Sequence, residues 1–353
     1  MHDYPVAEHR LENGLRVVVS TDHAVPAVAV QLWYDVGARH ERANRTGLAH
    51  LFEHLMFQGS TNVAPVEHFS LLQAAGATLN GTTGFDRTNY YETVPLGALD
   101  MALWLEADRM GGLLDALTQA GLDNQREVVK NERRQRYDNL PYGTAWERLF
   151  AALFSPAHPY HHMPIGSMRH LDEVTLSDCR EFFRTYYAPG NAVLAIVGDV
   201  EPEDALARVQ RYFRAIPPGP AVPAAVDGSV GPARGEVRQE ITEDVPSDAV
   251  YYAYRLPVEG SDGIEAADLA IRVLGEGASS RLTRRLVRRD QLAQSVSFSA
   301  MRLIGGVSVG TVVARAAQDV DAARLAEVAD EEIAEVAAHG VTAAELERAK
   351  AQF

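Results

Sequence analysis

Cysteine and long apolar runs are nearly absent from this chain of 353 residues. The one cysteine, Cys179, excludes an internal disulfide and the small folds that depend on disulfides. No stretch approaches the roughly 18 consecutive apolar residues that span a bilayer. The opening residues, MHDYPVAEHR, also lack the apolar core of a secretory signal. We therefore expect a cytoplasmic protein with no attachment to a membrane.

Positive charge is also scarce. Lysine and arginine number 33 against 48 aspartates and glutamates, which gives a formal net charge of -15. A surface this acidic repels phosphate backbones, so nucleic acid is not an expected partner. Hydrophobic residues make up 46% of the chain and charged residues 23%, which is an ordinary globular balance. The length predicts two domains.

The order of predicted elements occurs twice along the chain. The first half shows strand patterns at 15–20, 26–34, 77–86, 88–95 and 192–200, and helix patterns at 46–56, 97–118, 121–138, 176–187 and 201–213. Residues 216–235 are rich in proline and glycine, which predicts an extended linker. After it, EVRQEI and AVYYAYRLP match the opening strand pair. We predict a metal-binding domain at 1–215 and a second, inactive repeat at 236–353 that is truncated at its C-terminal end.

The sequence HLFEH at residues 50–54 is the strongest chemical signal in the chain. His50 and His54 are four residues apart, so on a helix their imidazoles leave the same face and can share one metal ion. Glu53 is about 100° around the helix from His54, where it can act on a metal-bound water as a general base. This is the H-x-x-E-H form of the zinc-peptidase motif. The alternative is a helix with two histidines and a salt-bridging glutamate, but apolar neighbours predict that the histidines are buried and need partners.

A catalytic zinc ion takes a third protein ligand and keeps one open position. The helix pattern at 125–136 offers Glu132, which follows Val128 by four residues and Val129 by three and so falls on their apolar face. Glu127 points toward solvent by the same geometry. A carboxylate on a core-facing stripe is costly unless it is paired or binds a metal. Glu132 is therefore the predicted third ligand, with an ordinary salt bridge as the alternative.

At these residues the chain resembles the pitrilysin, insulin-degrading enzyme and mitochondrial processing peptidase family of metallopeptidases. The resemblance covers essentially the whole chain. It is carried by four segments: GLAHLFEHLMFQGS, LNGTTGFDRTNYYETVP, REVVKNERR and YYAPGNAVLAIVGDV.

The resemblance implies an α+β fold of two similar domains, each a mainly antiparallel sheet flanked by helices. It implies that His50, His54 and Glu132 bind Zn²⁺ and that Glu53 is the general base. It also implies that the strand with Asn80, Gly81 and Thr82 binds substrate as an added β-strand, although Asn80 alone could equally be a turn residue.

Two departures from the family pattern stand out. Gln125 lies one heptad before Glu132, where relatives often have a second glutamate near the site, and an amide cannot supply charge. Val287 and Gln294 stand where active members have an arginine and a tyrosine that contact substrate from the second domain. We therefore expect a partner subunit that carries the arginine and tyrosine, or a homodimer.

Three functions remain open from the sequence. The first is a zinc endopeptidase, or its metal-bearing subunit, that cleaves unfolded peptides. The second is a non-catalytic scaffold or peptide-binding subunit of a peptidase complex. The third is a hydrolase of non-peptide amides. Manganese or cobalt could also occupy a site with two histidines and a carboxylate.

Overall fold

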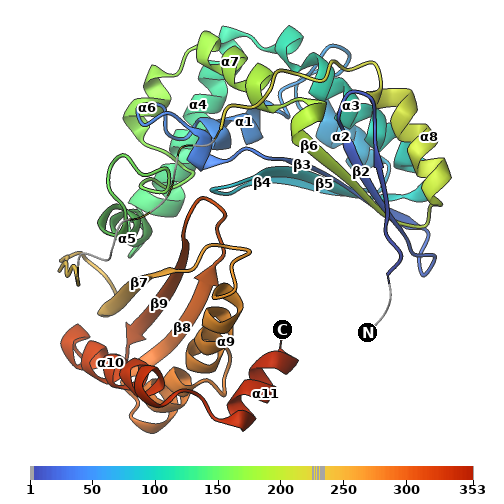
Figure 1. Ribbon diagram of the computed structural model, residues 1–353. Coiled ribbons are helices and arrows are strands. Elements are labelled where there is room, and N and C mark those ends of the chain that lie inside the picture. The colour runs from blue at the N-terminus through green and yellow to red at the C-terminus, as the bar shows by residue number, and fades with distance from the viewer. Residues whose placement is uncertain (1–3, 225, 227, 229, 231–234, 353) are drawn as a thin grey trace. The chain divides into compact units, whose positions relative to one another are not determined.

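The computed structural model describes residues 4–224, 226, 228, 230 and 235–352. The chain forms two compact units, one of Met1–Arg133 with Met163–Val226 and one of Arg134–His162 with Asp227–Phe353 (Figure 1). The sequence-based division at 216–235 left residues 134–162 with the first unit, whereas their contacts group them with the second. Part of the predicted linker (225, 227, 229 and 231–234) lies outside the described residues.

The first unit is built on a six-stranded sheet with the order β1-β2-β6-β3-β5-β4. Every neighbouring pair is antiparallel except β2 and β6, which run parallel. The strands are β1 (Ala7–Arg10), β2 (Arg16–Thr21), β3 (Ala27–Tyr34), β4 (Thr78–Thr83), β5 (Thr88–Pro95) and β6 (Ala192–Gly198). Within this sheet β4 is an edge strand, because it pairs with β5 alone.

Strand β3 shows why this sheet has two different faces. Val28, Val30, Leu32 and Tyr34 are fully buried, and the residues between them are partly exposed. This strict alternation places one set of side chains on the helix-covered face. The other set lies on the opposite face of the sheet.

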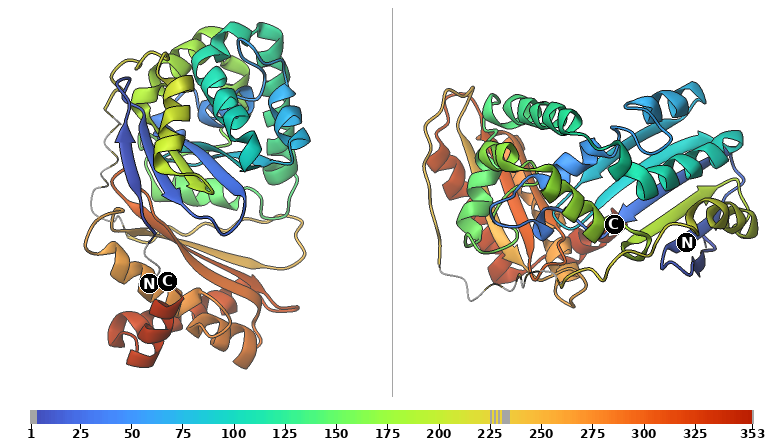
Figure 2. Two further views of the ribbon diagram at one scale, coloured as in Figure 1. Left: turned by 90° about the vertical axis from the view of Figure 1, so that its right-hand side faces the viewer. Right: turned by 90° about the horizontal axis from the view of Figure 1, so that it is seen from above.

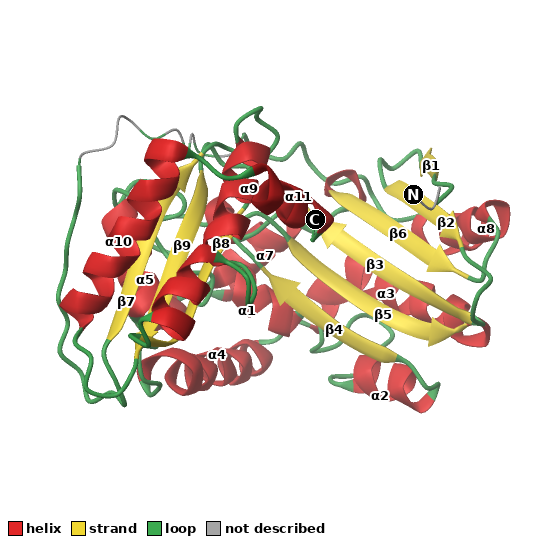
Figure 3. Cartoon of the chain, turned by 90° about the horizontal axis from the view of Figure 1, so that it is seen from below, coloured by secondary structure: helices red, strands yellow, loops and turns green. Residues whose placement is uncertain are grey.

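The helices of the first unit gather on one face of its sheet, as Figures 1 and 3 show and the two views of Figure 2 repeat. Among them, α1 packs its Phe52 ring against Phe182 and Tyr187, with ring centroids 5.3 Å apart in both pairs. The helices are α1 (Leu48–Leu55), α2 (Glu67–Ala74), α3 (Leu99–Ala116), α4 (Gln119–Arg133), α6 (Met168–Glu173), α7 (Leu176–Tyr186) and α8 (Pro202–Phe213).

The second unit has a three-stranded antiparallel sheet with the order β7-β9-β8. This order matches β3-β5-β4 of the first unit, element for element. Its core is formed by apolar side chains of the sheet and of the helices on it. The elements are β7 (Ala249–Leu256), β8 (Ala293–Met301), β9 (Ser308–Ala316), α5 (Ala145–Leu153), α9 (Ile264–Gly275), α10 (Ala322–His339) and α11 (Ala343–Ala351).

The strand predicted at 236–241 is wrong, because this segment has no regular secondary structure. A strand needs a neighbour for its backbone hydrogen bonds. In the first unit β2 obtains that neighbour from β6, and the described part of the second unit has no strand in the position of β6. The segment therefore has no partner strand to pair with.

The predicted α+β class is confirmed, since each unit combines a mainly antiparallel sheet with helices. The helix predicted at 121–138 ends earlier, because α4 gives way at Arg134–Asp138 to a π-helical turn. Among the described residues, no helix combines the length and the apolar character needed to cross a membrane.

Candidate metal centre

Helix α1 carries the H-x-x-E-H sequence and begins at a tightly fixed turn. Gly47 precedes the helix with a φ of 92°, a left-handed conformation that favours glycine. The Glu41 carboxylate accepts hydrogen bonds from the N–H groups of Gly47 at 2.9 Å and Ala49 at 2.7 Å. A negative charge at this end also complements the helix dipole. The start of α1 is therefore anchored by a buried side chain.

The structure brings His50, His54 and Glu132 together. The Nε2 atom of His54 lies 3.2 Å from Oε2 of Glu132, and Nε2 of His50 lies 3.7 Å from the same oxygen. One ligand atom from each of the three residues lies within 4.8 Å of the others. The side chains are 12%, 23% and 18% exposed for His50, His54 and Glu132 respectively, so they are partly rather than fully buried.

Glu132 reaches this group from the buried face of α4. That face follows Leu122, Gln125 and Val129, a spacing of three and four residues that continues to Glu132. Val128 was expected on this face, but it is 41% exposed. It falls outside the stripe because the buried spacing runs through Val129 instead.

The three donor types fit a zinc ion. Two imidazole nitrogens and one carboxylate oxygen form a common catalytic zinc set, with a fourth position open to water. The three groups approach one another closely enough to share one ion, and they come from two helices that contact each other.

Gln125 was predicted to support the ligands from one heptad away. It is 6% exposed and lies on the same buried stripe of α4 as Glu132. Within the residues that the structure describes, its side chain forms no hydrogen bond to either histidine or to Glu132. Gln125 is therefore near the site in the fold, but its predicted role stays a prediction.

Glu53 lies between α1 and the edge strand β4. A Cβ atom at Gly81 would lie 3.1 Å from Cγ of Glu53 and 3.2 Å from ring carbons of Tyr90. The absence of a side chain at Gly81 thus lets the strand approach the glutamate closely. Burial raises the pKa of the Glu53 carboxyl, and nearby Glu132 raises it further, whereas Thr83 and His54 lower it.

The other two predicted substrate-binding residues flank Gly81 on β4. Asn80 is exposed, and its Oδ1 accepts a hydrogen bond of 2.9 Å from the Gly81 N–H. The Thr82 hydroxyl donates to Asn89 Oδ1 at 2.6 Å. All three residues therefore lie on an edge strand next to the α1 helix.

The two departures in the second half lie within the second unit. Val287 is in the π-helical segment Thr283–Arg289 and packs against the core of that unit. Gln294 is exposed on β8 at an irregularity, because Ala293 pairs with Ala316 and Ser295 with Arg315. Gln294 is thus the extra residue of a β-bulge.

Comparison with protein families assigns both halves of the chain. Residues 16–158 match the family described as insulinase, peptidase family M16, and residues 173–353 match the peptidase M16 inactive domain. The chain belongs to the M16 peptidase family. This confirms the predicted resemblance. The half that holds His50, Glu53, His54 and Glu132 is the one that matches the peptidase description.

Individual M16 relatives agree with this assignment. The zinc protease PqqE of Helicobacter pylori is 33% identical over 83% of this chain and 66% of its own length. A probable mitochondrial-processing peptidase subunit beta of Arabidopsis thaliana is 25% identical over 81% of this chain and 55% of its own. The crystal structure of a protease from Helicobacter pylori superposes with a TM-score of 0.89 at 30% identity, over 99% of this chain and 84% of that one. The chain thus spans about two thirds or less of the two curated relatives.

Sequence reasoning missed Glu41, which fixes the start of the helix that carries the two candidate histidine ligands. Glu41 caps α1 and is 8% exposed, but it lies six residues before Gly47 in a segment with no regular pattern. A glutamate in such a segment ordinarily faces solvent. The signal available was the Thr46–Gly47 pair directly before an apolar helix, which marks a helix start without naming its cap.

Proposed function

We propose that this chain is a zinc-dependent endopeptidase, or the metal-bearing subunit of one, that cleaves unfolded peptides. The observation that carries the proposal is the convergence of His50, His54 and Glu132 on one point, with Glu53 on the same helix as the two histidines. Supporting it, the half of the chain that holds these residues matches the M16 peptidase description, and a relative is named a zinc protease.

The two histidines and Glu132 would hold the zinc ion. When bound, zinc supplies a Lewis acid that lowers the pKa of water and polarises a peptide carbonyl. Glu53 takes a proton from the attacking water onto a carboxylate oxygen, while the water oxygen bonds to the carbonyl carbon. As the C–N bond breaks and the carbonyl double bond forms again, Glu53 delivers that proton to the amide nitrogen, which leaves an amine and a carboxylic acid. The acid then loses its remaining proton to the amine or to water.

The edge of β4 gives the substrate a place to lie. An extended peptide that pairs with this edge gains backbone hydrogen bonds regardless of its sequence. Gly81 of β4 lies against Glu53 of α1, so a peptide paired with Asn80, Gly81 and Thr82 passes the Glu53 carboxylate. Recognition of this kind favours an extended, unfolded substrate, because most strands of a folded protein are already paired.

We further propose that full activity requires a second subunit. The second unit has Val287 and Gln294 where an arginine and a tyrosine were expected, and neither replacement can donate a charged hydrogen bond. A relative that is named a subunit of a larger peptidase supports this arrangement. The same two residues favour the alternative, a non-catalytic subunit that binds peptides.

The test combines metal content with peptide cleavage. Zinc is measured by elemental analysis in the wild type, in His50→Ala and in Glu127→Gln, whose carboxylate is exposed on α4. Cleavage of a quenched fluorescent peptide is measured on the same samples, alone and with an M16 subunit that carries the arginine and tyrosine.

One zinc per chain, lost in His50→Ala and kept in Glu127→Gln, with cleavage that depends on the added subunit, supports a divided metallopeptidase. Zinc with full activity of the chain alone removes the need for a partner. Zinc without activity in any mixture leaves the non-catalytic subunit. A wild type that holds no zinc after reconstitution contradicts the proposed function.

A further inference from the structure

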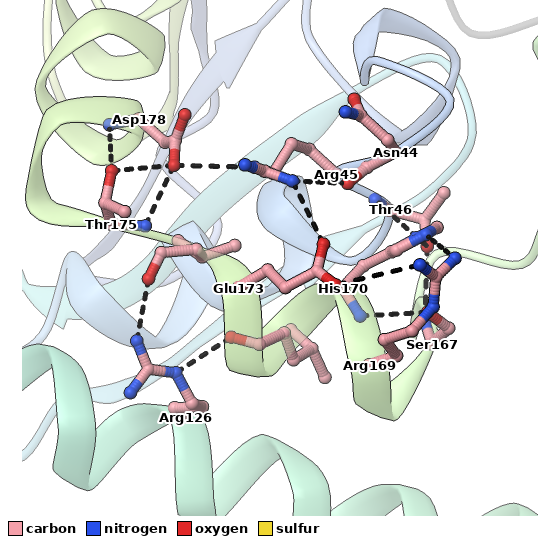
Figure 4. A network of polar contacts seen from close by, with 12 residues as sticks. Asn44, Arg45, Thr46, Arg126, Ser167, Arg169, His170, Glu173, Thr175 and Asp178 are labelled. Carbon is pink, nitrogen blue, oxygen red and sulfur yellow. Dashed lines mark hydrogen bonds and ion pairs between the residues drawn. The ribbon is translucent and has the colours of Figure 1, made fainter.

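Residues 166–174, here called the brace, contact both helices that carry the metal-ligand candidates. The brace contains α6 and lies in the first unit beside the start of α1 and along α4 (Figure 4). None of the brace residues belongs to the H-x-x-E-H sequence or to the ligand group. The brace contacts on each side are formed by specific, partly buried hydrogen bonds.

On the α4 side, two arginines donate to backbone carbonyls of the brace. Nε and Nη2 of Arg126 donate to the carbonyls of Leu171 and Val174 at 2.8 and 2.7 Å. Nη1 of Arg133 donates to the carbonyl of Gly166 at 2.6 Å. Each arginine therefore fixes one end of the brace to α4.

Arg126 and Arg133 lie next in sequence to the residues of α4 that face the candidate metal site. Arg126 and Arg133 are seven residues apart, and each directly follows a residue of the buried stripe, Gln125 or Glu132. Neighbouring residues on a helix point about 100° apart. Helix α4 thus presents Glu132 toward α1 and the two arginines toward the brace, so rotation of α4 about its axis would disturb both.

On the α1 side, the brace holds the residues directly before the helix. The Thr46 hydroxyl lies 2.8 Å from Nδ1 of His170 and accepts a hydrogen bond of 3.2 Å from the Ser167 N–H. Gly47 and Gly166 are in direct backbone contact, since a Cβ atom on Gly166 would lie 2.3 Å from Cα of Gly47. The start of α1 therefore cannot shift without moving the brace.

From these contacts we propose that the brace sets the spacing of α1 and α4, and that Thr46, Arg126 and His170 are positioning residues for the metal centre. The proposal rests on the proposed function insofar as it concerns zinc. Ligand atoms bind a metal well only when their supporting groups hold them within a fraction of an ångström. Loss of a hydrogen bond made directly to a metal ligand typically weakens metal binding by about 10- to 100-fold. The brace acts through the two helices, so the lower end of this range is the expected upper limit.

The first test measures zinc affinity by competition with a chromogenic chelator in the full chain. We expect Arg126→Met to weaken zinc binding by up to about 10-fold, because two carbonyls of the brace lose their charged donor. Arg42→Met is the matched control, since Arg42 is exposed and forms an ion pair with Glu181 on α7, which is exposed as well. The control removes the same charge and should keep the wild-type affinity.

A second pair of variants separates positioning from a general loss of structure. Thr46→Val keeps the side-chain shape but removes the hydroxyl, whereas Thr46→Ser keeps the hydroxyl. We expect Thr46→Val to weaken zinc binding and Thr46→Ser to restore it, with the midpoint of thermal unfolding measured for both. Variants that remain folded and bind zinc as tightly as the wild type would overturn the proposal.

Hydrogen exchange of the metal-free chain tests the brace even if no zinc binds. If the brace couples the helices, Arg126→Met accelerates amide exchange in Leu48–Leu55 as well as in Gln119–Arg133. Acceleration confined to α4 and α6 contradicts the proposal. Absence of zinc in the wild type, by contrast, would contradict the proposed function. The hydrogen-exchange result would then decide alone whether the brace couples α1 to α4.

Discussion

The two units share a layout but differ in what they place on one corresponding helix. In the first unit the α-helix that follows β3 is α1, with His50 and His54 four residues apart. In the second unit the α-helix that follows β7 is α9, where Asp268 and Arg272 occupy the same four-residue spacing and pair at 3.4 Å. In the Asp268–Arg272 ion pair the positive charge of the arginine balances the carboxylate. Two imidazoles and a carboxylate instead offer nitrogen and oxygen lone pairs that can bind a metal cation. The same architecture thus carries a candidate metal site in one unit and an ion pair in the other.

A second difference concerns buried charge. In the first unit Glu92, Glu106 and Arg109 are almost completely buried, and Arg109 Nε donates to Glu106 at 2.9 Å. The Arg109 guanidinium also lies over the Tyr90 ring, 4.2 Å from its centre. Burial raises the pKa of Glu92 well above its usual value, as does the adjacent Glu106 charge. In the second unit Asp268 and Glu345 are also buried, but their partners Arg272 and Arg281 are 20% and 14% exposed.

The largest expected effect on activity concerns Glu53, the proposed general base on α1 of the first unit. Glu53→Gln should reduce peptide cleavage by about 10²- to 10⁴-fold while zinc stays bound, because glutamine cannot accept and return a proton. Cleavage rate and zinc content are measured together. Glu127→Gln is the matched control and should retain activity. Undiminished cleavage by Glu53→Gln would remove Glu53 from the mechanism.

Arg109→Met should produce the largest change in stability. Methionine fills a similar volume but leaves the Glu106 carboxylate buried without its cation, which costs about 3–5 kcal/mol of unfolding free energy. The measurement is the urea midpoint of the full chain. Arg324→Met, at an exposed pair with Glu327, should change it by less than about 1 kcal/mol. Equal shifts of the urea midpoint in the two variants would mean that the buried Glu106–Arg109 pair contributes no more to stability than an exposed ion pair.

Gly81→Ala should have a smaller effect, and one that shows in both stability and catalysis. The added methyl group meets Cγ of Glu53 at 3.1 Å and the Tyr90 ring at 3.2 Å, so one of them must move. Such overpacking costs about 1–3 kcal/mol. A lower kcat with unchanged zinc content would show that the strand sets the position of Glu53. Gly97→Ala is the control, because nothing lies within 4 Å of its Cβ position.

The ligand group could be predicted from the sequence because its information is local. The spacing of His50, Glu53 and His54 fixes their directions on any helix, and the three-residue step from Val129 places Glu132 on a buried face. The α+β class followed from alternating and helical periods together with the resemblance to a known family. Only Val128 was placed on the wrong side of that face.

The supports of the site could not be predicted in the same way. Arg126 and Arg133 donate to backbone carbonyls. Every residue has a backbone carbonyl, so the sequence does not show which ones accept these hydrogen bonds. The unit boundary was also missed at 134–162, because a segment's contacts are decided by packing rather than by its place in the chain. The strand expected at 236–241 failed for a related reason, since a strand depends on a neighbour that its own sequence does not show.

The smallest expected effect tests an ionic contact of the second unit by pH. Hydrogen bonds from Arg281 lower the pKa of Glu345 to about 2, from an ordinary value of 4.5. Because the folded-state pKa is depressed, the contribution of this carboxylate is fully present above the ordinary pKa and is lost as the pH falls toward 2. Glu345→Gln should therefore lower the unfolding free energy by about 1 kcal/mol at pH 7. The difference from the wild type in urea midpoint should narrow by pH 4, and a constant difference would show that the ion pair is not its source.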